Sequence, residues 1–247
     1  MRQLEMVITM GGLGERFRRA GYDCPKYRIE ARGRTLFEWS LLSLAGFREA
    51  AAEWIFVALR DARYDVEDFV AQKCAALGIE NYHLILLDAL TDGQATTALA
   101  AQKFWHEENG LLIYNIDTYV EPGAMRAGEL KGAGFIPCFR GEGDHWSFVR
   151  LDAAGRVVEI REKERISPYC TLGAYYFESC ALYARLYREF YTEQQHSVRG
   201  ERYVAPLYDY LLRQGGEIFI SDVPREKVHV LGTPAELADF LAEQENP

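Results

Sequence analysis

The stretch LEMVITMGGLGERF, residues 4–17, decides how the rest of the chain can be interpreted. Its first part, Leu4–Thr9, is an apolar run typical of a buried strand, and three glycines follow between residues 11 and 14. Glycines let backbone N–H groups face an anion without interference from a Cβ atom. Arg16 and Lys26 would hold phosphate oxygens in two ways, as a fork and as a point charge. The stretch therefore predicts a strand followed by a phosphate-binding turn.

This turn differs from two common phosphate loops. It lacks the Gly-Lys-Ser/Thr ending of a P-loop, and Phe17 stands where a dinucleotide-binding fingerprint has its third small residue. A plain strand-turn-helix, whose glycines only permit a tight turn, is the structural alternative. The arginine and the Pro25-Lys26 pair favour the phosphate interpretation.

Composition limits the function classes. The chain has 247 residues, of which 49% are hydrophobic, so it is long enough for one large α/β domain or two small ones and can bury a substantial core. A net charge of −9 argues against general binding of nucleic acid, which depends on excess Lys and Arg. No apolar stretch approaches the roughly 20 residues that span a bilayer, and the N-terminus lacks a signal-peptide pattern. Five scattered cysteines fit reduced thiols, so we expect a cytoplasmic protein with no membrane partner.

Strand-like and helical patterns alternate through the first half of the chain. The expected strands are Met6–Thr9, Trp54–Ala58, Tyr82–Leu87 and Leu111–Ile116, and the expected helices lie near Thr35–Phe47, Val66–Leu77 and Gln94–Trp105. Such alternation indicates parallel βαβ units, and the continuous apolar strands indicate a sheet covered on both faces.

In the second half, strand-like runs follow one another closely. They lie at Gly134–Phe139, Trp146–Leu151, Val157–Arg161 and Leu172–Phe177, before helices near Cys180–Phe190 and Ala205–Gln214, strands at Ile218–Ser221 and Val228–Leu231, and a last helix that begins at Thr233-Pro234. The turn Asp152–Gly155 predicts antiparallel pairing of Phe148–Leu151 with Val157–Ile160. Together the halves predict an α/β fold with a mixed, mostly parallel central sheet flanked by helices.

The pattern Gly11-Gly12-x-Gly14-x-Arg16-Phe17, followed by Pro25-Lys26, resembles the signature of the nucleotidyltransferases that activate sugar phosphates. Glucose-1-phosphate thymidylyl- and uridylyltransferases are examples. The resemblance implies a single domain similar to the glycosyltransferase-A fold, with a nucleotide-binding half at about residues 1–120 and a substrate-binding half at about residues 121–247. It also implies an enzyme that joins a nucleoside triphosphate to a small phosphorylated substrate and releases pyrophosphate.

Further motifs match this family in the same order. Thr91–Ala95 resembles its base-recognition turn, in which Gln94 offers a donor and an acceptor to a base edge. Asp117 follows an apolar strand, where ligands gather in open α/β sheets, and in the family this position holds Mg²⁺. Glu162-Lys163 resembles a pair that contacts the substrate and its phosphate, and Gly173 lies in a similar following strand.

Near the C-terminus the chain departs from the family pattern at one position. Residues 228–237 resemble an Asp-x-Gly-Thr-Pro-Glu segment, but the aspartate that supplies a second metal ligand falls on Val230. His229 is adjacent but points to the opposite face of a strand, and Asp222 is a second nearby candidate. Either Asp117 and substrate phosphates hold the metal, or catalysis has been lost.

The resemblance implies a role for each matching residue. We expect Arg16 at the triphosphate, Lys26 at the α-phosphate, Lys163 at the incoming phosphate and Asp117 at Mg²⁺. The nucleotide would be bound by Met10, Gly11, Gly12, Gly14, Gly93 and Gln94, and the substrate by Glu162 and Gly173.

Two other functions stay open at this point. One is a family 2 type glycosyltransferase that consumes a nucleotide sugar, and the other is an inactive nucleotide-binding regulator. The base and the phosphorylated substrate are also open, because short relatives handle phosphocholine, phosphorylated amino-acid derivatives and sugar phosphates of surface polysaccharide pathways. The absence of a C-terminal β-helix extension leads us to expect a monomer or homodimer.

Overall fold

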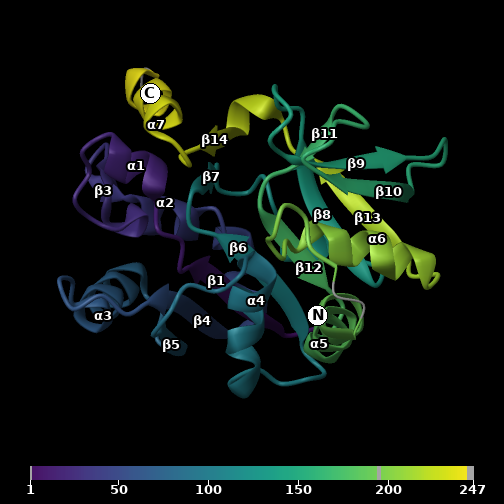
Figure 1. The fold of residues 1–247 in the computed structure, drawn as a ribbon, viewed down its shortest axis with the longest axis horizontal. Coiled ribbons are helices and arrows are strands. Elements are labelled where there is room, and N and C mark those ends of the chain that lie inside the picture. Colours follow the sequence, from purple (N-terminus) through teal and green to yellow (C-terminus); the bar gives the residue numbers. More distant parts are fainter. Residues whose placement is uncertain (1, 194–195, 244–247) are drawn as a thin grey trace.

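A mixed β-sheet runs through the protein in the computed structural model, which describes residues 2–193 and 196–243. Within these residues ten strands form the sheet, in the order β10-β9-β11-β8-β12-β6-β1-β4-β5, with β13 beside β8 (Figure 1). Of the two predicted halves, 1–120 includes residue 1, and 121–247 includes residues 194–195 and 244–247, which lie outside the described residues.

The first half of the chain forms a parallel block. It contains β1 (Leu4–Met10), β4 (Ala51–Leu59), β5 (Tyr82–Leu87) and β6 (Gly110–Asn115). β1 lies between β4 and β6 and runs parallel to both, so the carboxyl ends of β1 and β6 share one edge. Ligands bind at that edge in open α/β sheets.

The second half is mainly antiparallel. Its strands are β8 (Gly134–Phe139), β9 (Ser147–Leu151), β10 (Val157–Glu162), β11 (Tyr169–Thr171), β12 (Ala174–Phe177) and β13 (Ile218–Asp222). The predicted hairpin is confirmed, because β9 and β10 pair antiparallel. β12 pairs antiparallel with β6 and so joins the two halves in one sheet. The expected α/β fold with a mixed sheet is therefore confirmed.

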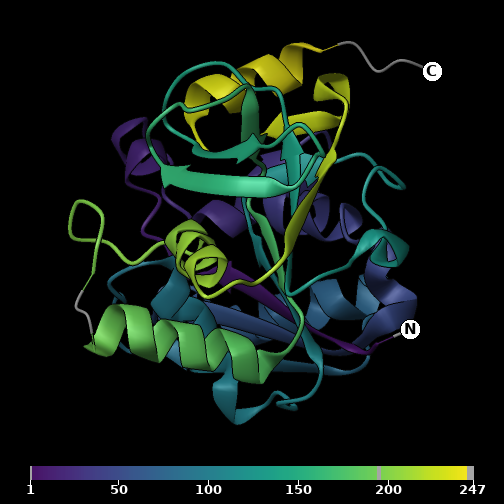
Figure 2. The same ribbon diagram turned by 90° about the vertical axis from the view of Figure 1, so that its right-hand side faces the viewer.

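Helices cover both faces of this sheet (Figures 1 and 2). α2 (Leu36–Leu42) and α3 (Val66–Leu77) bury Phe37 and Phe69 against one face. α4 (Gln94–Leu99), α5 (Cys180–Tyr187) and α6 (Ala205–Arg213) pack against the other face, where Tyr183 and Tyr208 are fully buried.

A third apolar cluster brings the C-terminus to the N-terminal region. α1 (Glu15–Arg19) and α7 (Pro234–Ala242) contribute Phe17 and Phe240, which pack with Trp39. A small sheet made by β7 (Thr118–Val120) and β14 (Val228–Val230) supports the same arrangement. Another short hairpin, β2 (Glu30–Ala31) with β3 (Arg34–Thr35), precedes α2. These contacts place residues 228–236 beside the loop that follows β1.

Several predicted boundaries need correction. The helix expected over Thr35–Phe47 ends at Leu42 and is followed by a 3₁₀ helix, Ala45–Ala50. The helix expected over Gln94–Trp105 ends at Leu99 before another 3₁₀ helix, Ala100–Lys103. α5 likewise ends at Tyr187, and a π-helix, Arg188–Glu193, follows it. The strand expected over Leu172–Phe177 begins only at Ala174, as β12, because Gly173 adopts φ +88° just before it, and β11, which ends at Thr171, was not predicted.

The described helices include none that is both long and apolar enough to cross a membrane. The cysteines at 24, 74, 138, 170 and 180 all carry free thiols.

Glu5 is a fully buried carboxylate in the strand that leads to the glycine-rich loop. Its Oε1 accepts hydrogen bonds from the backbone N–H of His106, at 3.1 Å, and from Asn109 Nδ2, at 2.7 Å. These bonds fasten the segment before β6 to the start of β1. They compensate part of the cost of removing a carboxylate from water.

We predict that Glu5→Ala lowers the free energy of unfolding by about 1–3 kcal/mol, because two donors lose their acceptor and a cavity is left. Urea unfolding measures the change. Glu49→Ala, at an exposed glutamate, is the control and should stay within about 0.5 kcal/mol of the wild type. Equal stability of the two variants would contradict a structural role for Glu5.

Candidate active site

The glycine-rich loop connects β1 to α1 at the edge where parallel strands end. Gly14 adopts φ +63°, a left-handed conformation that favours glycine, and its carbonyl accepts a hydrogen bond from the N–H of Arg18 at 3.0 Å. A Cβ on Gly14 would lie 3.7 Å from Lys26 Cβ. The loop therefore packs closely against the segment that carries Lys26.

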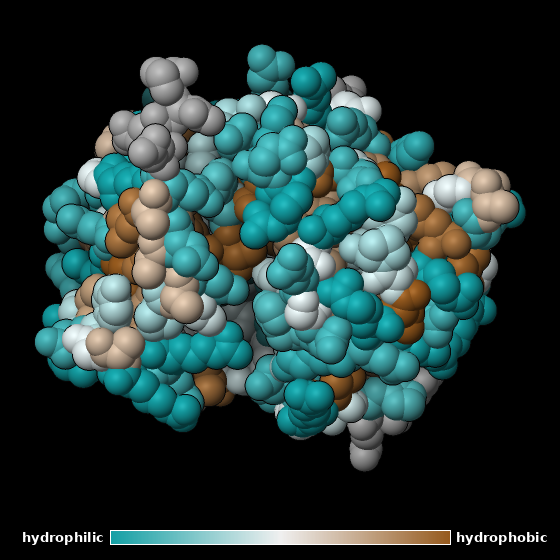
Figure 3. Space-filling model, turned by 90° about the horizontal axis from the view of Figure 1, so that it is seen from above, coloured by the Kyte–Doolittle hydropathy of each residue, from teal (hydrophilic) through white to brown (hydrophobic). Residues whose placement is uncertain are grey.

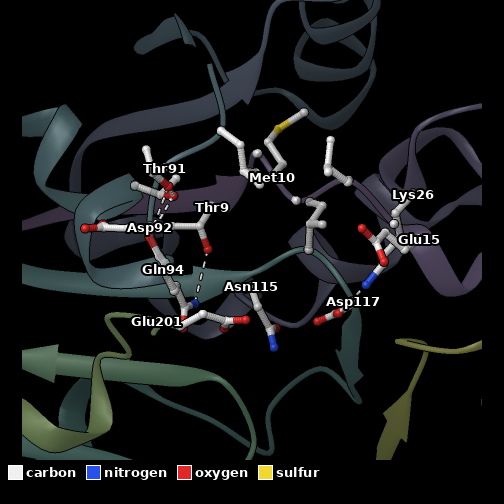
Figure 4. A pocket seen from close by; sticks show the side chains of 18 residues that line it. Thr9, Met10, Glu15, Lys26, Thr91, Asp92, Gln94, Asn115, Asp117 and Glu201 are labelled. Atoms are coloured by element: carbon white, nitrogen blue, oxygen red, sulfur yellow. Dashed lines mark hydrogen bonds and ion pairs between the residues drawn. The ribbon is translucent and has the colours of Figure 1, made fainter. Parts of the chain in front are cut away.

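A first cavity of about 540 Å³ opens beside this loop. Figure 4 shows Gln94 and Thr9 on one side of it, Lys26 and Asp117 on the other, and Asn115 between them. The residues expected to bind nucleotide all line this cavity: Met10, Gly11, Gly12, Gly14, Gly93 and Gln94. Glu201, from the loop before α6, lines it as well, and nothing in the sequence pattern had singled it out.

The turn before α4 is fixed by close backbone contacts. Gly93 adopts φ +146°, and a Cβ there would lie only 2.4 Å from the carbonyl oxygen of Arg202. That oxygen accepts a hydrogen bond from Ala95 N at 3.0 Å, and the Arg202 guanidinium pairs with Asp92 at 3.0 Å. Gln94 Nε2 donates to Thr9 Oγ1 at 3.1 Å. A side chain at position 93 would force these segments apart.

A second cavity of about 440 Å³ adjoins the first, and the two share Gly14, Glu15, Lys26, Asn115 and Asp117 in their walls. Its remaining lining comes from α1, from the start of β7, from the loop before β9 and from the C-terminal segment: Arg16, Arg19, Thr118, His145, Trp146, Val230, Gly232 and Glu236. The surface seen from above is hollowed near its middle, between two mostly hydrophilic parts (Figure 3).

Arg16 lines this second cavity rather than the first. Within the described part of the chain its guanidinium has no ion-pair partner, whereas Arg19 pairs with Glu15 at 3.0 Å. The exposed Arg16 is therefore available to an anion.

An ion pair stands on the wall that the two cavities share. Lys26 Nζ lies 2.8 Å from Asp117 Oδ2, and the two side chains are 20% and 25% exposed. Asp117 lies just beyond β6, which ends at Asn115, one residue earlier than expected, and its backbone carbonyl accepts a hydrogen bond from Leu231 N at 2.8 Å. The pair thus brings a cation and a carboxylate to the point where the two cavities meet.

The structure separates the remaining predicted site residues from the two cavities. Among the described residues that line them, Glu162, Lys163 and Gly173 are absent. Lys163 has φ +56°, its Nζ donates to the Tyr203 hydroxyl, and its backbone N donates to the carbonyl of Trp146 at 2.8 Å. Gly173 affects the cavities only through Asn115, which lines both of them. A Cβ on Gly173 would lie 2.1 Å from Asn115 Nδ2, so only glycine leaves room for that side chain.

Glu162 is mostly buried at the end of β10. Removal from water raises the pKa of its carboxyl, and a hydrogen bond donated by the Ser147 hydroxyl works in the opposite direction.

Neither residue considered as a substitute for the missing aspartate faces the shared wall. Asp222 accepts hydrogen bonds from Arg140 Nε and Nη2, both at 3.1 Å, on the far side of β8. His229 stacks on Tyr119, and its Nδ1 lies 2.9 Å from a carboxylate oxygen of Glu243. Both candidates are therefore wrong on geometry, since other partners hold them outside the two central cavities.

Comparison with known proteins extends this picture. The crystal structure of the nucleoside-diphosphate-sugar pyrophosphorylase from Vibrio cholerae RC9 superimposes with a TM-score of 0.86 at 34% sequence identity, covering 96% of this chain and 100% of that one. The inositol-1-phosphate CTP transferase from T. maritima (TM-score 0.76, 15% identity, 98% of each chain) shares the fold. So does a putative glucose-1-phosphate thymidylyltransferase from Bacillus anthracis (TM-score 0.75, 14% identity, 97% of this chain and 94% of that one). No protein-family model and no curated protein matches the chain.

The fold, the two-cavity site and these comparisons define an enzyme of the nucleotidyltransferase type. The extent and identity of the match to the Vibrio protein are sufficient to assign a family. The chain belongs to the nucleoside-diphosphate-sugar pyrophosphorylases.

The raised pKa of Glu162 predicts a pH dependence of stability. The folded state keeps this proton at a pH where the unfolded chain, with its ordinary glutamate pKa of about 4.3, has lost it. The associated stability is present below that value and is lost as the pH rises through the raised pKa. We therefore expect wild-type protein to lose stability relative to Glu162→Gln between acidic and neutral pH, measured by urea unfolding across that range.

Glu159, on the same strand, is the control of opposite sign. A hydrogen bond from Arg150 lowers the pKa of its carboxyl. Wild-type protein should therefore gain stability relative to Glu159→Gln as the pH rises from the lowered pKa to the ordinary glutamate value of about 4.3, and should keep that gain at higher pH. Parallel pH profiles for wild type and Glu162→Gln would contradict the burial argument.

Proposed function

We propose that this enzyme joins a nucleoside triphosphate to a small phosphorylated substrate, a sugar 1-phosphate or a similar compound, with release of pyrophosphate. One observation carries the proposal. Two adjoining cavities, one beside a glycine-rich loop, share a wall that bears the Lys26–Asp117 pair. A transfer between two phosphate-bearing molecules needs such a place, where both meet the same fixed charges.

The first cavity suits the triphosphate. In the proposal, Met10, Gly11, Gly12 and Gly14 present backbone to the phosphates, and Gly93 and Gln94 bind the base. Support comes from their common position around one cavity and from the hydrogen bond that already orients Gln94. We further propose residues 1–120 as the nucleotide-binding half and residues 121–247 as the substrate-binding half.

Nucleotidyl transfer demands little covalent chemistry from the protein. An oxygen of the substrate phosphate attacks the α-phosphorus. The bond from that phosphorus to the oxygen that bridges to the β-phosphate breaks, and pyrophosphate leaves with the electron pair. We assign Lys26 to the α-phosphate, since its ammonium lies on the shared wall. Arg16, free of ion pairs within the described residues, would contact the phosphates from the second cavity. Both cations would stabilise the charge that develops between the attacking and leaving oxygens.

We propose Mg²⁺ as the metal ion, held by Asp117. The donor set fits, because carboxylate oxygen is a ligand that Mg²⁺ prefers and one or two carboxylates are enough beside substrate phosphates. Asn115 lines both cavities, and its buried Oδ1 has no hydrogen-bond partner in the described structure. When bound, the ion neutralises phosphate charge and orients phosphate oxygens.

Glu162, Lys163 and Gly173 remain proposed substrate-side residues through their match to the family motif. Lys163 contacts the backbone of Trp146, which lines the second cavity, and Gly173 makes room for the Asn115 side chain. From the same resemblance we propose a place in surface polysaccharide precursor synthesis. The five free thiols support a cytoplasmic location. The proposed oligomeric state is a monomer or homodimer.

A pyrophosphate-release screen tests the reaction. Purified protein with Mg²⁺ is crossed with CTP, UTP, dTTP and GTP against sugar 1-phosphates, phosphocholine and phosphorylated amino acids. We expect release that depends on one triphosphate and one phosphorylated substrate. Hydrolysis of a nucleotide sugar without pyrophosphate release would instead support a glycosyltransferase, and tight triphosphate binding without turnover would support a regulator.

Lys26→Ala should lower kcat by about 10²–10³-fold, because a preorganised cation at the α-phosphate is lost. Steady-state pyrophosphate release measures the effect, and circular dichroism checks the fold. Lys73→Ala is a matched control, since Lys73 forms an equally short 2.8 Å pair with Glu38 and is similarly buried, at 26% exposure, away from both cavities. Near-normal turnover of Lys26→Ala would exclude the proposed role.

A further inference from the structure

In the family motif that residues 228–237 resemble, an aspartate supplies a second metal ligand, and in this chain its position is taken by Val230. Val230 lies in β14 opposite Thr118, the residue after Asp117, and it lines the second cavity. A carboxylate at position 230 would therefore stand near Asp117. The valine side chain has no oxygen to offer a cation, so this register position contributes none.

Another carboxylate faces the same space from α7. Glu236 Oε2 lies 3.4 Å from the position that a Cβ on Gly232 would occupy, and Asp117 Oδ2 lies 3.3 Å from that position. Gly232 itself lines the second cavity, together with both acidic residues. The missing Cβ thus leaves a space that is bordered by one carboxylate oxygen from each of the two residues. Any larger residue at 232 would fill it.

The local structure of α7 does not account for the orientation of Glu236. Thr233 caps the helix, and its Oγ1 accepts a hydrogen bond from Glu236 N at 3.2 Å. In α2 the corresponding glutamate, Glu38, completes a capping box by accepting a hydrogen bond from Thr35 N at 2.8 Å. Glu236 makes no such return bond and no ion pair within the described residues. Its carboxylate is directed to the cavity instead.

Two carboxylates beside one open space repel each other unless a cation lies between them. Lys26 compensates Asp117 at 2.8 Å, but no described lysine or arginine pairs with Glu236. Asn115 lines the same cavity, and its buried Oδ1 has no hydrogen-bond partner in the described structure. Carboxylate and amide oxygens are the ligands of hard divalent cations.

We propose that Glu236 is the second carboxylate of the metal site, acting with Asp117 in place of the aspartate that the family motif would put at position 230. This inference rests on the proposed function for the identity of the ion. With Glu236 and Asp117 the metal site has two carboxylates, although position 230 is a valine.

Binding of Mn²⁺ in the absence of substrates tests the assignment directly. The free-ion signal in electron paramagnetic resonance is followed as Mn²⁺ is titrated into wild type, Glu236→Gln and Asp239→Asn. We expect Glu236→Gln to raise the apparent Kd by at least about ten-fold, the usual scale for disturbing a metal site. Asp239→Asn removes one exposed charge from the same helix and should leave the Kd unchanged. Equal affinity of Glu236→Gln and wild type would overturn the proposal.

A rescue variant separates ligation from helix capping. Glutamine suits the third position of a helix, so Glu236→Gln should keep α7 folded. Adding Val230→Asp to Glu236→Gln should restore Mn²⁺ affinity, because it returns a carboxylate to the neighbourhood of Asp117. No recovery in a folded double variant would overturn the idea that Glu236 replaces that aspartate.

Turnover distinguishes this proposal from the proposed function. In Glu236→Gln the Mg²⁺ concentration for half-maximal pyrophosphate release should rise by about ten-fold or more. A change confined to the KM of the phosphorylated substrate, with Mn²⁺ binding intact, would assign Glu236 to substrate and overturn its metal role. Wild type that binds Mn²⁺ through Glu236 but never releases pyrophosphate would contradict the proposed function alone.

Discussion

The Lys26–Asp117 ion pair connects three segments that are distant in the sequence. Lys26 follows the glycine-rich loop, Asp117 follows β6, and the backbone carbonyl of Asp117 holds Leu231 at the start of the C-terminal segment. Both charged groups are only partly exposed, so loss of either would leave an uncompensated charge in a confined space. This pair, together with the backbone hydrogen bond from Leu231, therefore links the glycine-rich loop, the end of β6 and the segment that leads to α7.

The C-terminal segment also depends on aromatic packing for its position. β14 pairs with β7 over only three residues of each strand. α7 adds Phe240, whose ring packs edge-on against Trp39 with centroids 5.3 Å apart, and Tyr119 lies 4.7 Å from the same indole. Such buried aromatic contacts fix the direction in which α7 begins. They explain how a helix from the end of the chain can deliver a carboxylate to a cavity built mainly by the first half.

Sequence patterns predicted the order and type of most elements, because buried strands and βαβ alternation have strong periodic signals. Element ends were less predictable, since they depend on tertiary contacts. Gly173, for example, interrupts an apolar run only because its φ of +88° lets the backbone turn beside Asn115. The helix that begins at Gln94 passes into a 3₁₀ helix at Ala100, although its small apolar residues continue without a break.

The candidate site was predicted unevenly for a related reason. The glycine-rich loop, Gln94 and Asp117 lie at strand ends, so the topology alone brings them together. Lys163 also lies just past a strand, but a left-handed backbone and the Tyr203 hydroxyl hold its side chain outside both cavities. Glu236 could not be singled out from the sequence, because glutamate at the third position of a helix that begins after a threonine is common as a capping residue. The structure shows that its carboxylate does not cap the helix: Glu38 accepts a hydrogen bond from the N-cap residue Thr35, whereas Glu236 accepts none from Thr233.

Two glycines show why such a site is hard to infer from one sequence. At Gly93 the space of the missing Cβ is taken by the backbone of Arg202, so that glycine serves packing. At Gly232 the corresponding space is bordered by oxygens of Asp117 and Glu236 instead of backbone. A metal site of this kind requires an open space with oxygen ligands around it. It does not require that a carboxylate come from one particular position in β14. A ligand lost from β14 can be replaced from α7, provided that both elements border the same space.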